Sequence, residues 1–219
     1  MKYIYHHLGL GDHIICNGIV RHYKEIYGEV TVFCKPHNYE NVKYMYQDDE
    51  NITVLSVGED WDVNVYIFEN KISKDVIKIG FESLSSVNCT TFDEGFYKGN
   101  DVPFSVRFQN FHIDRDFETE KEIMLELNPN NERYIFTHNI DKSKVRSDLK
   151  IIENPTNHNI FNLISLIENA EEVHLMESSI KCLVNSYKMD KPTFFYHNYV
   201  RGYSPYYNTV GLNKFEIIN

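Results

Sequence analysis

A glycine-containing turn near the start of the chain holds the residues best suited to chemistry. Residues 7–12 (HLGLGD) follow an apolar run, 3–5, and precede a helix-like segment, 14–27. A strand, a glycine turn and a helix in this order form a corner where backbone N–H groups point outward, and such corners bind phosphates and sugars. Asp12 stands where the turn enters the helix. Its carboxylate is therefore a candidate proton acceptor.

The glycine pattern of this turn does not fit two common nucleotide sites. Gly9 and Gly11 lack the third glycine of G-x-G-x-x-G, because Ile14 occupies that position. The Gly-Lys-Ser/Thr ending of a P-loop is also missing. A structural alternative stays open, in which the glycines only permit a tight turn and Asp12 only caps the helix. His7 and His13 flank the turn and are candidates to orient a substrate hydroxyl.

No metal site is predicted from the sequence. The histidines around the turn do not have the spacing of H-E-x-x-H, and the four cysteines contain no C-x-x-C pair. Residues 60–62 (DWD) and 114–116 (DRD) match the D-x-D pattern with which some enzymes hold a metal and a diphosphate. Among 32 acidic residues such matches arise by chance. A metal-dependent D-x-D enzyme is kept as a rival hypothesis.

A second polar cluster lies in the other half of the chain. Glu177, Ser178 and Ser179 follow a predicted strand, 172–176, and open the next helix-like segment. Hydroxyls and free N–H groups at such a helix start suit a diphosphate or a ribose. The alternative is that Ser178 is only an N-cap. Arg201 follows the last clear strand and is a candidate phosphate ligand.

The composition limits the class of protein. With 219 residues, 42% of them hydrophobic, the chain can bury a core in one large domain or two small ones. A net charge of −10 disfavours a nucleic-acid surface. The cysteines are widely spaced, as expected for free thiols in the cytoplasm, and no apolar run reaches the roughly 20 residues of a membrane helix. We therefore expect a cytoplasmic protein without an integral membrane segment.

Alternating elements predict an α/β fold with parallel sheets. After the opening strand and helix, the apolar pattern predicts further elements along the chain. In chain order these are a strand at 29–34, a helix at 38–47, strands at 52–57, 62–68 and 76–81, a helix near 89–97, a helix at 114–126, a strand at 134–138, a polar loop to 154–155, a helix at 160–170, a strand at 172–176, a helix at 178–189 and a strand at 193–197. The irregular stretch 83–116 is the expected boundary between two small Rossmann-like lobes.

These residues resemble the heptosyltransferase-type (family 9) glycosyltransferases. Residues 7–12, followed by 14–15 (II) and 17–21 (NGIVR), are similar to the start of that family, which has a strand, a Leu-Gly-Asp turn and a helix ending in Arg. Residues 163–170 and 174–183 (HLMESSIKCL) are similar to its C-terminal pattern. The match covers about a third of the chain. The chain departs from the family by lacking the Asp-Ser-Gly pattern after Met176, and it is shorter than a full enzyme.

The resemblance implies a GT-B fold with the active site in a cleft and no required metal. It implies that residues 1–110 form an acceptor-side lobe and residues 111–219 a donor-side lobe. Asp12 matches the family's proposed catalytic base, and Glu177, Ser178 and Ser179 fall where the nucleotide-sugar donor is held. No further cofactor is implied, and the partners are a nucleotide-sugar and a glycan acceptor. The alternative is a non-catalytic nucleotide- or sugar-binding module on the same scaffold.

Overall fold

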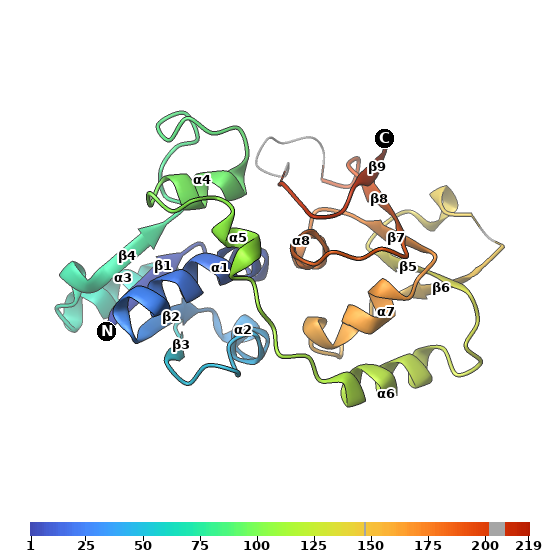
Figure 1. Ribbon diagram of the computed structural model, residues 1–219, viewed down its shortest axis with the longest axis horizontal. Coiled ribbons are helices and arrows are strands. Elements are labelled where there is room, and N and C mark those ends of the chain that lie inside the picture. Colours follow the sequence, from blue (N-terminus) through green and yellow to red (C-terminus); the bar gives the residue numbers. More distant parts are fainter. Residues whose placement is uncertain (147, 202–208) are drawn as a thin grey trace. The chain divides into compact units, whose positions relative to one another are not determined.

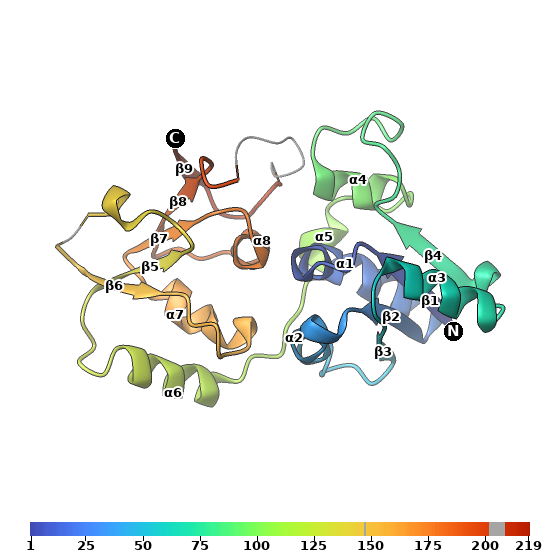
Figure 2. The same cartoon turned by 180° about the vertical axis from the view of Figure 1, so that it is seen from behind.

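The computed structural model describes residues 1–146, 148–201 and 209–219, and its contacts divide the chain into two compact units. The first unit comprises Met1–Asp114 with a short later stretch ending at Val210, and the second begins at Arg115 and includes Gly211–Asn219. Each unit is built around one parallel sheet (Figures 1 and 2). The α/β class and the two Rossmann-like parallel sheets predicted from the sequence are confirmed.

The first unit contains a four-stranded sheet in the order β3-β2-β1-β4, with every pair parallel. Its elements are, in chain order, β1 (Lys2–His6), α1 (Leu10–Tyr27), β2 (Val30–Cys34), α2 (Tyr39–Met45), β3 (Ile52–Ser56), α3 (Asp60–Glu69), β4 (Val76–Ile79), α4 (Phe92–Lys98) and α5 (Val106–Gln109). Short 3-10 turns lie at Pro36–Asn38 and Ser73–Asp75.

Both faces of this sheet are covered, because alternate side chains of β1 and β2 point to opposite sides. Tyr5 and Phe33 pack with Val63 and Ile67 of α3 on one face. Ile4 and Val32, at the intervening positions, are completely buried on the other face, which α1 covers. Figures 1 and 2 show these two helices on opposite sides of the sheet.

The strand predicted at 62–68 is wrong, because this segment is the helix α3. Its apolar residues look alternating in the sequence, but only Val63 and Ile67, one helical turn apart, are buried, while Phe68 is 81% exposed. Glu59 and Asp62 form a reciprocal capping box that begins the helix. Local capping therefore decides the conformation of this short segment.

Close packing of α1 against α5 depends on Gly18. A Cβ at this position would lie 2.5 Å from the carbonyl oxygen of Val106 and 3.0 Å from the Cα of Arg107. These are backbone atoms, so α5 would have to move. We expect Gly18→Ala to lower the free energy of unfolding by about 1–3 kcal/mol in urea titrations. Glu25→Ala, at an exposed position of the same helix, should change it by less than about 0.5 kcal/mol. Equal stabilities of the two variants would contradict this role of Gly18.

The second unit contains a five-stranded sheet in the order β6-β5-β7-β8-β9, also wholly parallel. Its elements are α6 (Phe117–Leu127), β5 (Tyr134–His138), β6 (Lys150–Glu153), α7 (Ile164–Glu168), β7 (Glu172–Leu175), α8 (Ser179–Ser186), β8 (Thr193–His197) and β9 (Phe215–Ile218), with 3-10 turns at Lys142–Lys144 and Ile160–Leu163. The sequence pattern predicts a loop over residues 150–153, and this prediction is wrong because they form the edge strand β6.

Each sheet has one point at which the chain reverses the direction in which it adds strands. In the first unit the chain builds β2 and β3 on one side of β1 and then places β4 on the other. In the second unit β6 lies on one side of β5, and β7, β8 and β9 lie on the other. In open parallel sheets, ligands bind beyond the carboxyl ends of the strands that flank such a point. The ends of β1 and β4, and those of β5 and β7, are therefore the positions to inspect.

Candidate functional site

The predicted corner of the first unit lies at the carboxyl end of β1. Helix α1 begins at Leu10 with Gly9 as N-cap, which is earlier than the sequence pattern indicated. Asp12 therefore lies in the first helical turn, where a carboxylate is favoured by the helix dipole. A Cβ on Gly9 would be 2.5 Å from Oδ2 of Asp12, so the glycine leaves room for this carboxylate. Asp12 and Gly11 are half-buried and Gly9 is exposed.

Two histidines lie in the core beneath this corner. His6 and His13 are completely buried, and their ring centroids lie 4.4 Å apart in an edge-to-face arrangement. Burial lowers the pKa of His6 to about 4 and holds the pKa of His13 well below its ordinary value. Both rings are therefore neutral at pH 7. His13, which was predicted to contact substrate, supports the turn from the core and does not reach its surface.

These histidines make stability depend on pH. The unfolded chain takes up protons on these histidines near pH 6.5, whereas in the folded chain the pKa of His6 is about 4 and that of His13 is well below its ordinary value, so stability must fall as the pH is lowered below about 6.5. We expect urea titrations to lose about 1.4 kcal/mol per pH unit for each histidine that stays neutral. His13→Phe should reduce this slope, whereas His37→Phe, at an exposed position, should leave it unchanged. A slope unaffected by His13→Phe would contradict the assignment.

A cavity of about 250 Å³ opens at the switch point of the first sheet, between the ends of β1 and β4. His7 stands at its wall, and Nε2 of its half-buried ring lies 2.8 Å from the carbonyl oxygen of Gly80, to which it donates. The wall combines polar groups with aromatic rings, from His7, Gly80, Glu82, Ser83, Leu84, Phe92, Gly95 and Phe96. Of these residues, only His7 was singled out in the sequence.

The predicted corner of the second unit lies at the carboxyl end of β7. Ser178 is the N-cap of α8 and accepts a hydrogen bond from the backbone N–H of Lys181 at 3.4 Å, while Ser179 is the first helical residue. Glu177 is buried and forms an ion pair of 2.6 Å with Lys181. Burial raises the pKa of Glu177, and the charges of Lys181 and Arg201 oppose this shift. Ser178 thus caps α8, as the alternative interpretation of this residue predicted.

Arg201 is exposed, and its charge acts on both strands at the second switch point. Burial lowers the pKa of His138 at the end of β5, and Arg201 adds to that shift. It also acts on Glu177 after β7. Arg201 is therefore within electrostatic range of both strand ends.

Three of the four carboxylates in the two D-x-D segments accept hydrogen bonds within the fold. Asp60 accepts a hydrogen bond of 2.9 Å from the hydroxyl of Tyr5, and Asp62 accepts one of 2.6 Å from the backbone of Glu59. Asp116 caps α6 by accepting from Thr119 at 3.0 Å. Within the described ranges, no group of three or more His, Cys, Asp or Glu side chains is arranged to hold a metal ion.

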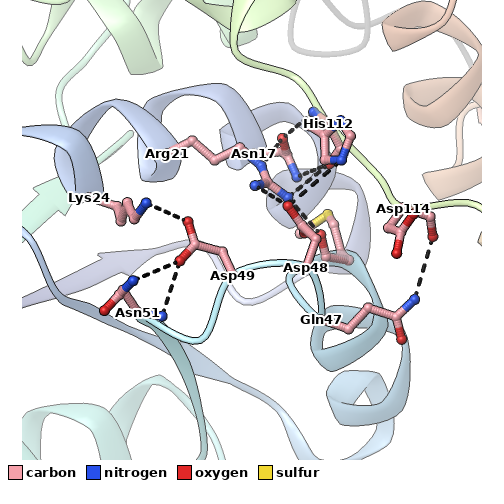
Figure 3. Close-up of polar contacts among 10 residues, drawn as sticks. Asn17, Arg21, Lys24, Gln47, Asp48, Asp49, Asn51, His112 and Asp114 are labelled. Carbon is pink, nitrogen blue, oxygen red and sulfur yellow. Dashed lines mark hydrogen bonds and ion pairs between the residues drawn. The ribbon is translucent and has the colours of Figure 1, made fainter.

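Arg21, the arginine of the segment 17–21, is committed to a structural network (Figure 3). Its guanidinium donates to both carboxylate oxygens of Asp48 at 2.8 and 2.7 Å, and to the carbonyl oxygen of His112 at 3.1 Å. Asn17 exchanges two further hydrogen bonds with the backbone of His112, at 3.2 and 3.0 Å. The network fastens α1 to the segment leading out of the first unit.

None of the helices formed by the described residues combines the length and the apolar character needed to cross a lipid bilayer.

Comparison with known proteins gives a likeness of fold. No family model matches the chain, and no curated protein matches it in sequence. Among solved structures, it is similar to the crystal structure of the glycosyl transferase family 9 from Veillonella parvula DSM 2008, with a TM-score of 0.55 and 8% sequence identity. The alignment covers 99% of this chain and 85% of the other. The chain therefore has a GT-B-like, glycosyltransferase-like fold.

Proposed function

We propose that this chain transfers a sugar from a nucleotide-sugar donor to a glycan acceptor without a metal ion, with Asp12 as the base. The observation that carries the proposal is the position of Asp12. It is a partly exposed carboxylate in the first turn of α1, at the carboxyl edge of a parallel sheet and next to its switch point. The likeness of fold to a family 9 glycosyltransferase supports the same function.

The proposed reaction requires a base for the acceptor and a cationic site for the leaving group. The acceptor hydroxyl attacks the anomeric carbon and gives its proton to Asp12, while the bond from that carbon to the diphosphate oxygen breaks. The nucleoside diphosphate leaves with the electron pair. The N-terminus of α8 and the guanidinium of Arg201 would stabilise its charge. Glu177, Ser178 and Ser179 shape this donor edge of the second unit.

The first unit would bind the glycan acceptor. Its switch-point cavity places His7 beside the aromatic rings of Phe92 and Phe96. Phe81, whose ring centroid is 4.8 Å from that of His7, is 43% exposed. Exposed aromatic faces pack against the apolar faces of sugar rings, and an imidazole can orient a hydroxyl. Gly9 and Gly11 keep the backbone accessible at the neighbouring corner.

A non-catalytic binding module is the second candidate. It is favoured by the second corner, where the Ser178 hydroxyl already serves as a cap and Glu177 is paired with Lys181. A corner so engaged can still bind a diphosphate through backbone N–H groups and Arg201. This candidate predicts saturable binding of a nucleotide-sugar without turnover.

A thermal-shift panel of UDP-, GDP-, ADP- and CMP-sugars tests donor binding. Specific binding stabilises the folded chain, by about 2.7 kcal/mol when the ligand is at 100 times its dissociation constant. We expect one nucleotide class to raise the melting temperature and Arg201→Gln to lose most of that rise. Arg133→Gln is the matched control, because Arg133 is exposed and directly precedes β5, at the amino ends of the strands of the same sheet. No shift with any of the four would contradict donor binding.

A further inference from the structure

A chain of four polar side chains runs across the second sheet. His174 of β7 lies between Glu172 and His197: its Nε2 is 3.1 Å from a carboxylate oxygen of Glu172, and its Nδ1 is 2.9 Å from Nε2 of His197. Nδ1 of His197 is in turn 3.0 Å from the hydroxyl oxygen of Tyr199. Both imidazoles are buried. We call these four residues the Glu172–Tyr199 relay.

The carboxylate end fixes the direction of every hydrogen bond in the relay. An ionised carboxylate only accepts, so His174 must carry its proton on Nε2 and donate it to Glu172. Arg146 supplies a positive charge at the other carboxylate oxygen, 2.9 Å from its Nε. A neutral His174 then has a bare Nδ1, which accepts from Nε2–H of His197. Nδ1 of His197 is therefore bare as well and accepts the hydroxyl proton of Tyr199.

The tyrosine end independently agrees with this direction. The backbone N–H of Asp141 donates to the Tyr199 oxygen at 3.2 Å, and a backbone N–H can only donate. The single hydroxyl proton of Tyr199 is thus free to point at His197. Burial lowers the pKa of His174, and it lowers the pKa of His197 to about 4. Both rings therefore stay neutral at pH 7, as the hydrogen-bond pattern requires.

The relay runs from the amino ends of the strands to their carboxyl ends. Glu172 is the first residue of β7, whereas His197 is the last residue of β8 and Tyr199 lies just beyond it. Tyr199 is half-buried and lies at the carboxyl edge, where ligands of parallel sheets bind. Lys144 covers its ring, with Nζ 4.0 Å from the centroid. The relay thus ends at the tyrosine oxygen, beside the carboxyl ends of the strands.

We propose that the Glu172–Tyr199 relay presents the Tyr199 oxygen as a hydrogen-bond acceptor for a hydroxyl group of a bound ligand. The only proton of this hydroxyl is committed to His197, so a group that approaches from solvent must bring its own proton. Sugar and ribose hydroxyls meet that requirement, whereas an ionised phosphate oxygen does not. Tyr199 would thereby select the sugar-like part of a ligand. This ligand assignment rests on the proposed function, but the direction of the relay does not.

Nitrogen-15 spectra of the two imidazoles test the direction of the relay without any ligand. In the full chain labelled at histidine, we expect His174 and His197 to be neutral at pH 7 with their protons on Nε2. Glu172→Leu removes the anchor and should produce a mixture of tautomers at His174. Glu171→Leu is the matched control, because Glu171 pairs with Arg133 and Lys191 and touches neither ring. A proton on Nδ1 of either ring in the unsubstituted chain would overturn the proposal.

Binding then tests the ligand assignment. For the nucleotide-sugar that stabilises the chain in the thermal-shift panel, Tyr199→Phe should weaken the affinity about tenfold, the effect of one lost hydrogen bond in a desolvated site. Unchanged affinity would overturn the assignment of a ligand hydroxyl to Tyr199. If none of the four nucleotide-sugars binds, the proposed function and this assignment both fail. The tautomers of His174 and His197 would still report the direction of the relay, so the two failures are distinguishable.

Discussion

Arg107→Met should lower the free energy of unfolding by about 3–5 kcal/mol, because it leaves a buried carboxylate without its counter-charge. Asp93 of α4 and Arg107 of α5 form an ion pair in which both side chains are completely inaccessible to solvent. The same pair holds the backbone of Val210, which accepts from Arg107 at 2.9 Å and donates to Asp93 at 3.0 Å. Urea unfolding followed by circular dichroism measures the loss.

Two further variants separate charge from packing at this pair. Asp93→Leu combined with Arg107→Met removes both charges and should recover part of the stability, since an apolar pair needs no compensation. Arg133→Met removes an arginine that is 68% exposed on its side chain and should change stability by less than about 1 kcal/mol. A loss below about 1 kcal/mol for Arg107→Met would show that this pair does not stabilise the fold.

Asp12→Asn should slow sugar transfer by about 10²–10⁴-fold, the usual contribution of a positioned base. An amide keeps the shape of the side chain but cannot take up the acceptor proton. Donor affinity should stay the same, because the proposed donor edge belongs to the second unit. Release of nucleoside diphosphate in the presence of a mixture of oligosaccharide acceptors measures the rate.

Asp62→Asn is the matched control for Asp12→Asn. Both carboxylates stand at the third position of a helix that follows a strand of the same sheet, after N-caps at Gly9 and Glu59. Only Asp12 lies beside the switch point, whereas α3 follows the edge strand β3. We therefore expect Asp62→Asn to transfer sugar at the rate of the unsubstituted chain, whereas Asp12→Asn loses activity. Equal losses in both would indicate a general effect on helix capping.

In the second sheet the sequence predicts the central strands well and the edge strands poorly, whereas in the first sheet it also predicts the edge strands β3 and β4. The segments 134–138 and 193–197 each contain three consecutive apolar residues, and the structure has strands with those same bounds. The edge strands β6 and β9 escape notice because each has only one neighbour in the sheet and carries charged residues. Helix α3 is misread because a short apolar run has no decisive period, and its capping box decides the outcome.

The candidate site is predictable where it depends on local order along the chain. The succession of a strand, a polar turn and a helix is enough to identify the corners at Asp12 and at Ser178. The Glu172–Tyr199 relay is not predictable in this way. His174 and His197 meet only because β7 and β8 pair side by side, and their parallel register places His174 opposite Phe195. Contacts that depend on strand order are not written in the local sequence.

Turnover of a nucleotide-sugar, compared between the unsubstituted chain and Asp12→Asn, tests the central claim most directly. The chain is incubated with the donor that stabilises it and with oligosaccharide acceptors, and the nucleoside diphosphate formed is quantified. We expect release by the unsubstituted chain and a loss of about 10²-fold or more in Asp12→Asn at equal donor affinity. Saturable donor binding without release would instead establish a binding module, and equal release by both chains would remove Asp12 from the mechanism.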